Sequence, residues 1–234
     1  PDGLGITICI GEQTEETYKR LFEAGAHRYL LRIETTNPDL FKKIHPPEQS
    51  MENRIKSLET LKKIGFQTGT GVMIGIPGQT IDDLVNDIQF FKEFDIDMIG
   101  MGPYIVHNET PMSIYQEENS LNKEIIYELA LKMIAVSRII LKDVNIAATT
   151  ALQAMYPFGR EEGLNFGANV LMPLLTPGEV RGNYLLYEGK PCIDDNAEDC
   201  FLCIQSRVEQ TGRSVKLYNW GDPVHFFNKQ NNDN

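Results

Sequence analysis

The chain has 234 residues, of which 41% are hydrophobic and 24% charged, so it is long enough to bury a large apolar core. Its formal net charge of −11 and its pI near 4.9 argue against a nucleic-acid-binding surface, which would be basic. No apolar stretch approaches the roughly 20 residues of a membrane-spanning helix, and the first residues do not resemble a secretory signal. The composition therefore predicts a cytoplasmic globular protein with no membrane or nucleic-acid partner.

Short apolar runs alternate with amphipathic stretches along the chain. The predicted strands are residues 6–10, 29–33, 68–74, 98–101, 144–148 and 169–172. The predicted helices are residues 14–24 with Thr14 as N-cap, 50–64 ending at Gly65, 80–94 with two aspartates in its first turn, and 122–141. This alternation predicts parallel strands joined by right-handed crossovers.

Six strand–helix units are fewer than the eight that close a TIM barrel. We therefore expect an α/β fold, a (βα)8 TIM barrel of which this chain carries strands 3–8 with their helices, the first two units lying upstream. An open, doubly wound sheet is the alternative. We expect the barrel in residues 1–180, a cysteine-containing extension in residues 181–227, and a polar, disordered tail in residues 228–234.

A cation and an anion follow each other closely where the second predicted strand ends. Arg32 and Glu34 are two residues apart, so their side chains point to the same face of an extended chain. Charged residues are seldom buried unless they are paired, and a purely structural ion pair is one interpretation. The position at a strand end favours the other interpretation, a site for a zwitterionic ligand.

Hydroxyl side chains occupy comparable positions on two other predicted strands. Thr7 lies in the first strand, and Thr149 and Thr150 end the fifth. Adjacent threonines with free donors would suit a carboxylate, especially opposite Arg32. Threonine is also common in strands for structural reasons alone, so this prediction depends on the arginine.

The four cysteines fall into two groups. Cys9 lies alone in an apolar run, which favours a small buried hydrophobe. Cys192, Cys200 and Cys203 cluster near the C-terminus, which in a cytosolic chain favours metal binding over disulfides. Three thiolates would bind an iron–sulfur cluster with one open position, or zinc with a fourth ligand such as His225. Three unligated thiols are the alternative.

A series of motifs runs along nearly the whole chain. The motifs are Arg-Ile-Glu-Thr-Thr-Asn-Pro at 32–38, Glu-Asn-Arg at 52–54, the glycine-rich stretch 71–83, Gly-Met-Gly-Pro-Tyr-Ile-Val-His at 100–107, Ala-Thr-Thr-Ala at 148–151, and Gly-Ala-Asn-Val-Leu-Met-Pro at 167–173. Together they resemble the radical S-adenosylmethionine (SAM) superfamily. Within it, the chain is similar to the FeFe-hydrogenase maturases, relatives of biotin synthase and methylornithine synthase, and the spacing Cys192-x7-Cys200-x2-Cys203 looks like an auxiliary iron–sulfur site of some of these maturases.

The resemblance implies an enzyme that cleaves SAM reductively to a 5′-deoxyadenosyl radical inside a barrel of the radical SAM type. A 4Fe–4S cluster held by three cysteines donates the electron, and a possible auxiliary 2Fe–2S or 4Fe–4S cluster would lie at the C-terminal cysteines. The implied substrate is a small cysteine-containing iron complex, a precursor of the hydrogenase di-iron centre. The implied partners are the other hydrogenase maturases and an electron donor such as ferredoxin or flavodoxin.

The same resemblance assigns residues to the site. It implies cofactor contacts for SAM, substrate contacts for an anion-binding pocket deep in the barrel, and cluster ligands. The SAM contacts are Glu34, Arg54, Met172, Tyr184 and Tyr187; the substrate contacts are Thr7, Arg32, Thr149, Thr150 and Ala151; the metal ligands are Cys192, Cys200 and Cys203. Arg54 suits the methionyl carboxylate of SAM.

The chain departs from the family pattern in one motif. The signature Cys-x3-Cys-x2-Cys, which holds the SAM-cleaving cluster, does not occur among its four cysteines. We therefore expect those ligands upstream, and expect the chain by itself to be inactive. Three functions remain open: a hydrogenase maturase, a mutase that makes methylornithine from lysine, and a non-enzymatic binding scaffold.

Overall fold

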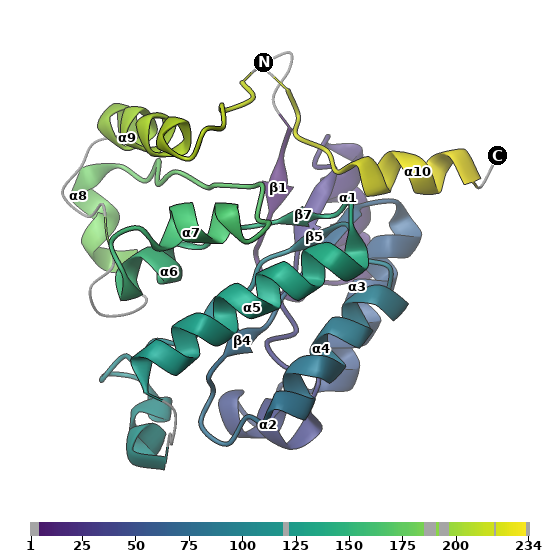
Figure 1. Ribbon diagram of the computed structural model, residues 1–234. Helices are drawn as coiled ribbons and strands as arrows, with labels where there is room; N and C mark the ends of the chain where they lie inside the picture. Colours follow the sequence, from purple (N-terminus) through teal and green to yellow (C-terminus); the bar gives the residue numbers. More distant parts are fainter. Residues whose placement is uncertain (1–4, 119–121, 185–190, 192–196, 218, 233–234) are drawn as a thin grey trace.

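The computed structural model describes residues 5–118, 122–184, 191, 197–217 and 219–232 (Figure 1). Its main sheet has five parallel strands in the order β1-β2-β3-β5-β7, and a parallel pair, β4 and β6, follows β3 and β5 along the chain. The strands are β1 Thr7–Ile8, β2 Arg28–Leu30, β3 Gln67–Thr70, β4 Met73–Ile74, β5 Met98–Ile99, β6 Gly102–Pro103 and β7 Asn145–Ile146.

The strands of the main sheet neighbour each other in chain order. A doubly wound sheet reverses its order at a switch point, and this sheet does not, so that alternative is wrong. The TIM-barrel-like α/β fold of the prediction is confirmed. Of the six predicted strands, five contribute to the main sheet, and the sixth is represented in the described residues by a single parallel bridge between Ala147 and Val170.

The predicted strand 68–74 is divided into β3 and β4 around Gly71. A Cβ at Gly71 would lie 2.0 Å from the carbonyl oxygen of Gly100. The two backbone segments can therefore pass this closely only because Gly71 has no side chain. The next residue, Val72, forms an isolated parallel bridge with Glu34. This bridge holds the loop that carries Glu34 beside the segment that joins β3 to β4.

Helices cover the sheet, and the predicted ones begin at their predicted caps. Thr14, Ser50, Thr80 and Asn122 each accept a hydrogen bond from a backbone N–H three residues on, and Gly65 ends α3 with φ of 108°. The helices are α1 Glu15–Glu23, α2 Pro38–Ile44, α3 Met51–Ile64, α4 Ile81–Glu93, α5 Lys123–Leu141, α6 Thr150–Met155, α7 Gly159–Asn165, α8 Gly178–Arg181, α9 Ala197–Gln210 and α10 Val224–Asn232, with 3₁₀ turns η1 Pro111–Glu118 and η2 Gly182–Tyr184.

None of the helices in the described residues combines the length and the hydropathy that crossing a membrane requires. Two apolar clusters fill the space between these helices and the sheet. The larger one includes Ile33, Val72 and Ile146 together with side chains of α4 and α5, and the smaller one packs Tyr18 edge to face on Tyr29 beneath α1 and α3. The outer helices are therefore fixed to the strands by buried apolar area.

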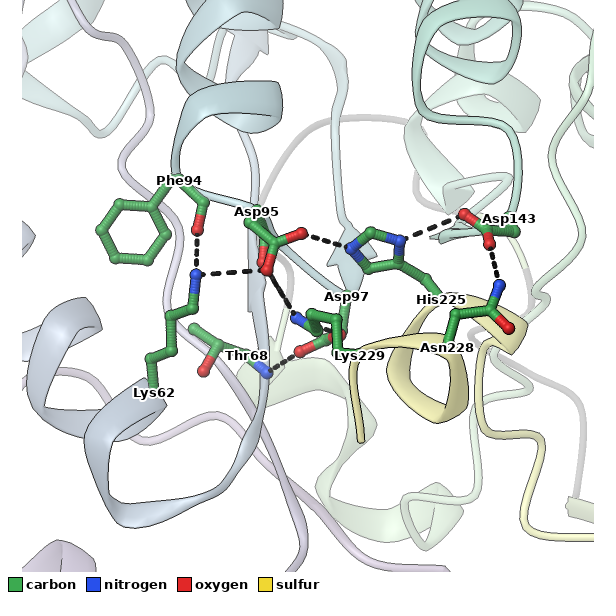
Figure 2. A network of polar contacts seen from close by, with 9 residues as sticks. All are labelled: Lys62, Thr68, Phe94, Asp95, Asp97, Asp143, His225, Asn228 and Lys229. Carbon is green, nitrogen blue, oxygen red and sulfur yellow. Dashed lines mark hydrogen bonds and ion pairs between the residues drawn. The ribbon is translucent and has the colours of Figure 1, made fainter. Parts of the chain in front are cut away.

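The C-terminal helix α10 is bound by ion pairs to residues near the amino ends of β5 and β7 (Figure 2). His225 places Nε2 2.7 Å from Asp95 Oδ1 and Nδ1 3.1 Å from Asp143 Oδ1. Lys229 Nζ lies 2.7 Å from Asp97 Oδ1 and 3.3 Å from Asp95 Oδ2. Because Asp97 is only 2% exposed, its charge depends on this lysine.

The prediction of a disordered C-terminal tail is wrong. The tail expected to be disordered from Asn228 is helical as far as Asn232, and Asn228 donates a hydrogen bond of 2.8 Å to Asp143 Oδ2. His225, the candidate fourth ligand for zinc, places both of its ring nitrogens against carboxylates, those of Asp95 and Asp143. This helix was not predicted because contacts with residues far away in the chain hold it against the sheet.

Replacing Lys229 with Met should lower the free energy of unfolding by about 2 kcal/mol, because it leaves the buried Asp97 carboxylate without its counter-ion. Urea denaturation measures this change. Lys132→Met is the matched control: Lys132 and Glu128 form an exposed pair on α5, and its loss should change the free energy by less than about 0.5 kcal/mol. Equal effects of the two substitutions would contradict the stabilising role of the α10 contacts.

Candidate functional site

The loop after β2 carries an ion pair between Arg32 and Glu34. Arg32 Nη2 lies 2.9 Å from Glu34 Oε2 and donates a hydrogen bond of 3.0 Å to the carbonyl oxygen of Val72. The two side chains are paired, although β2 ends at Leu30, before both residues, so strand alternation is not what brings them together. Glu34 has a φ of 67°, in the left-handed region that residues other than glycine rarely adopt, so the fold holds its carboxylate in place at a cost in backbone strain.

Arg54 reaches this loop from the first turn of α3. Its guanidinium is buried, with Nε 2.5 Å from Glu12 Oε1, Nη1 donating to the carbonyl oxygen of Arg32, and Nη2 donating to Gln49 Oε1 over 3.1 Å. Its guanidinium carbon lies 5.8 Å from the ring centre of Phe41. Arg54 therefore joins α3 to the ends of the first two strands.

Helix α4 supports the residues that follow Glu34. The Asp87 carboxylate accepts hydrogen bonds from the backbone N–H and the hydroxyl of Thr36, at 2.8 and 2.7 Å. Burial raises the pKa of Asp87 to about 6, although the Thr36 hydrogen bonds oppose the shift. Burial alone would raise the pKa of Asp83 too, but hydrogen bonds from Thr80 and Asn37 lower it below its usual value.

Thr149 and Thr150 begin α6 at the carboxyl end of β7. The Thr149 hydroxyl does not cap the helix, and within the described residues its oxygen is buried without a hydrogen-bond partner. The Thr150 hydroxyl accepts a hydrogen bond of 2.8 Å from Nη2 of Arg160. Ala151, the next residue of α6, is half-buried.

The backbone of β4 and β6 lies between Arg32 and these threonines. The Val72 carbonyl oxygen accepts hydrogen bonds both from Arg32 Nη2, at 3.0 Å, and from the backbone N–H of Gly102, at 3.4 Å. A Cβ on Gly102 would be 2.5 Å from the Thr149 hydroxyl oxygen, so Gly102 and Thr149 are in close contact. The predicted substrate arginine and threonines thus lie near one another at the carboxyl ends of the strands.

The other predicted site residues are not joined to Arg32 and its neighbours by polar contacts in the described part of the chain. Thr7 lies in β1 and is exposed, and Met172 is 48% exposed two residues beyond the bridge at Val170. Tyr184 is the last residue of η2. Tyr187 lies outside the described residues. Within the described part of the chain, no hydrogen bond or ion pair joins Thr7 or Met172 to the Arg32 cluster.

The cysteines differ in their surroundings. Cys200 is buried in the larger apolar cluster and Cys203, three residues on in α9, is exposed, whereas Cys192 lies outside the described residues. Among the residues that the structure describes, no three His, Cys, Asp or Glu side chains are grouped as metal ligands. Cys9, which was expected to be buried, is exposed in the described chain, directly after β1.

Three side chains of the site were not predicted. Glu12 follows Gly11 directly after the first strand, a position at which a barrel carries functional groups, so its partner role could have been foreseen. Gln49 lies just before α3 and Arg160 lies in α7, and neither residue belongs to a recognisable motif. Only folding brings Gln49 and Arg160 to Arg54 and Thr150.

Comparison with known families and proteins identifies relatives of this arrangement. Residues 2–91 match the family model of the Radical SAM superfamily. The chain is 47% identical to the [FeFe] hydrogenase maturase subunit HydE of Thermotoga maritima over 225 residues, which are 96% of this chain and 62% of that protein. It is 27% identical to 3-methylornithine synthase of Methanosarcina acetivorans, over 74% of this chain and 46% of that protein.

Solved structures agree on the fold. Methylornithine synthase (PylB) superposes with a TM-score of 0.73 at 22% identity, covering 92% of this chain and 60% of that one. HydG, a maturase of the [FeFe]-hydrogenase, gives a TM-score of 0.67 at 16% identity, covering 96% and 49%. At these identities the likeness concerns the fold alone. The chain spans about three fifths of the length of the HydE relative that it matches.

Replacing Asp87 with Asn should remove a pH dependence of stability. The folded state binds the Asp87 proton more tightly than the unfolded state, so this proton stabilises the fold at about pH 4, and the contribution is lost as the pH rises through about 6. The unfolding free energy of the unmodified chain should therefore fall by about 3 kcal/mol relative to Asp87→Asn between these pH values.

Urea denaturation of both proteins at about pH 4 and about pH 7 measures the difference. Asp82→Asn, at an exposed position on the same helix, is the control and should keep the decline of the unmodified chain. A decline of equal size in Asp87→Asn would contradict the assignment.

Proposed function

This chain belongs to the radical SAM superfamily, and we propose that it serves in the maturation of FeFe-hydrogenase by binding SAM and an amino-acid-bearing substrate at the carboxyl ends of its strands. The observation that carries the proposal is the convergence of Arg32, Glu34 and Arg54 on one loop. When bound, the 4Fe–4S cluster and SAM supply the one-electron reductive cleavage that starts radical chemistry. The chain's own residues bind and orient the reacting groups.

The Arg54 and Glu34 side chains fit the amino-acid end of SAM. SAM presents a carboxylate and an ammonium group there, and the site offers a guanidinium and a carboxylate. Glu12 already places a carboxylate oxygen 2.5 Å from Arg54 Nε, so the methionyl carboxylate would share or replace this contact. We assign Met172, Tyr184 and Tyr187 to the remainder of the SAM site on the resemblance alone.

Arg32 and the two threonines fit an anionic substrate group. Arg32 supplies the positive charge, and the buried Thr149 hydroxyl has a hydrogen that a bound carboxylate could accept. Thr7 and Ala151 complete this proposed site. Its substrate would be a cysteine-containing iron complex, since a cysteine ligand carries the carboxylate that these residues recognise.

Hydrogenase maturation is favoured over the mutase reaction by sequence. Identity to the HydE relative is 47%, against 27% to 3-methylornithine synthase. We propose the other hydrogenase maturases and a low-potential electron donor, ferredoxin or flavodoxin, as partners. A maturation assay that supplies the remaining maturases tests this assignment: hydrogenase activity that depends on a protein containing this chain supports it, and methylornithine formation from lysine would replace it.

Replacing Arg54 with Lys should weaken SAM binding about tenfold or more, because an ammonium group cannot reproduce the planar, bidentate donor edge of a guanidinium. Isothermal titration calorimetry with SAM measures the change. Arg138→Met removes another half-buried arginine, one that donates to the carbonyl oxygens of Gly167 and Val144, and should leave SAM affinity unchanged. An unaltered affinity in Arg54→Lys would contradict the assignment of Arg54.

We propose that Cys192, Cys200 and Cys203 bind an auxiliary iron–sulfur cluster. Cys200 and Cys203 are three residues apart on α9 and so lie on neighbouring positions of one helix surface. Replacing both with Ser should reduce the iron bound after anaerobic reconstitution, because thiolates are the ligands of such clusters. Iron and sulfide analysis measures this, with Cys9→Ser as the control, and unchanged iron in the double variant would contradict the proposal.

A further inference from the structure

We infer that Arg160 is a positioning residue that directs the hydroxyl hydrogen of Thr150 toward the carboxylate of the substrate. The inference rests on the proposed function, because it deepens the assignment of Thr149 and Thr150 to an anionic substrate group. It assigns the orientation of the Thr150 donor to a residue outside the family motifs, on a separate helix.

The contact between the two side chains has one possible direction. Arg160 Nη2 lies 2.8 Å from Thr150 Oγ1, and a guanidinium has donors but no acceptor. The threonine oxygen therefore accepts this hydrogen bond with one of its lone pairs. Arg160 is 5% exposed, so the interaction is shielded from water and stronger than a surface contact.

Accepting this bond determines what Thr150 can offer to a ligand. A hydroxyl has a single hydrogen, and with the oxygen engaged by a cation the hydrogen is turned away from Arg160 and made a better donor. The neighbouring Thr149 hydroxyl is buried and lacks a hydrogen-bond partner within the described residues. Two adjacent hydroxyl donors suit the two oxygens of a carboxylate.

Arg160 is itself held firmly. It follows Gly159, where a Cβ would lie 2.1 Å from the carbonyl oxygen of Leu152, so the start of α7 is pressed against α6. The next residue, Glu161, is 7% exposed and forms an ion pair with Arg207 of α9, with oxygen–nitrogen distances of 2.5 and 2.8 Å. The two residues that flank Arg160 are thus both held by α6 and α9, which fixes the backbone from which the guanidinium reaches Thr150.

Local positive charge matters in this chain because its net charge is −11, which disfavours the approach of an anion. Arg32 contacts the Val72 carbonyl oxygen on one side of the β4–β6 backbone, and Arg160 contacts Thr150 beyond it. The two arginines act on the carboxylate in different ways. Arg32 attracts the carboxylate directly, and Arg160 acts through the threonine hydroxyl.

A ligand pair that differs in the carboxylate tests the inference. L-cysteine and L-cysteine methyl ester are titrated against this chain with ligand-observed NMR, since only the first carries the anionic group. Arg160→Met and Thr150→Val should each weaken L-cysteine binding about tenfold, the equivalent of one charge-assisted hydrogen bond, with little effect on the ester. The double variant should bind no more weakly than either single one, because both substitutions remove the same donor.

Three further variants separate positioning from structure. Thr150→Ser keeps the hydroxyl and should keep the affinity, and Arg160→Lys keeps a cationic donor and should restore part of it. Arg138→Met should lower the melting temperature without altering binding of either ligand, because Arg138 contacts carbonyl oxygens away from these threonines.

The possible failures are distinguishable. Equal affinity of the unmodified chain for L-cysteine and its ester would overturn the proposed anion site, and the inference with it. A preference for L-cysteine that survives Arg160→Met would overturn the inference alone. Additive losses in the double variant would show that Arg160 acts independently of Thr150 and would also overturn it. If Arg160→Met does not fold, Arg160→Lys with an affinity no better than that of Thr150→Val would overturn it as well.

Discussion

Parallel pairing of the strands is the constraint on which the other features of this structure depend. It places the carboxyl ends of neighbouring strands at one edge and their amino ends at the other. Residues far apart in the chain, such as Arg32 after β2 and Thr149 after β7, therefore meet at the same edge. Close passage of Gly71 over Gly100, and of Gly102 over Thr149, keeps the strands near enough for this to happen.

The two edges of the sheet carry charged networks of different kinds. At the amino edge, the aspartates next to β5 and β7 form ion pairs with His225 and Lys229 of α10 (Figure 2). At the carboxyl edge, the Thr149 hydroxyl lacks a partner within the described residues, and Glu34 is held at a positive φ. Satisfied groups stabilise the fold, whereas unsatisfied and strained ones are typical of binding sites.

Buried polar side chains of the outer helices contact residues of the proposed site and hold them in place. Asp87 of α4 fixes Thr36 in the loop after Glu34, and Arg160 of α7 fixes Thr150. A buried polar group that loses its hydrogen-bond partner costs free energy. A change in the packing of either helix would therefore displace the residue that the helix supports. The geometry at the strand ends is thus a property of the surrounding helices as much as of the loops.

The sequence by itself determined the strand–helix alternation, the helix caps and the closeness of Arg32 and Glu34, because each depends on residues a few positions apart. Only the tertiary structure decided what depends on distant partners. It gave the chain-ordered sheet, the helical state of residues 228–232, the exposure of Cys9 directly after β1, and the pairing of Arg54 with Glu12. Ion pairs and hydrogen bonds between side chains leave no periodic trace in a sequence, since their geometry is fixed only when buried apolar packing has brought the elements together.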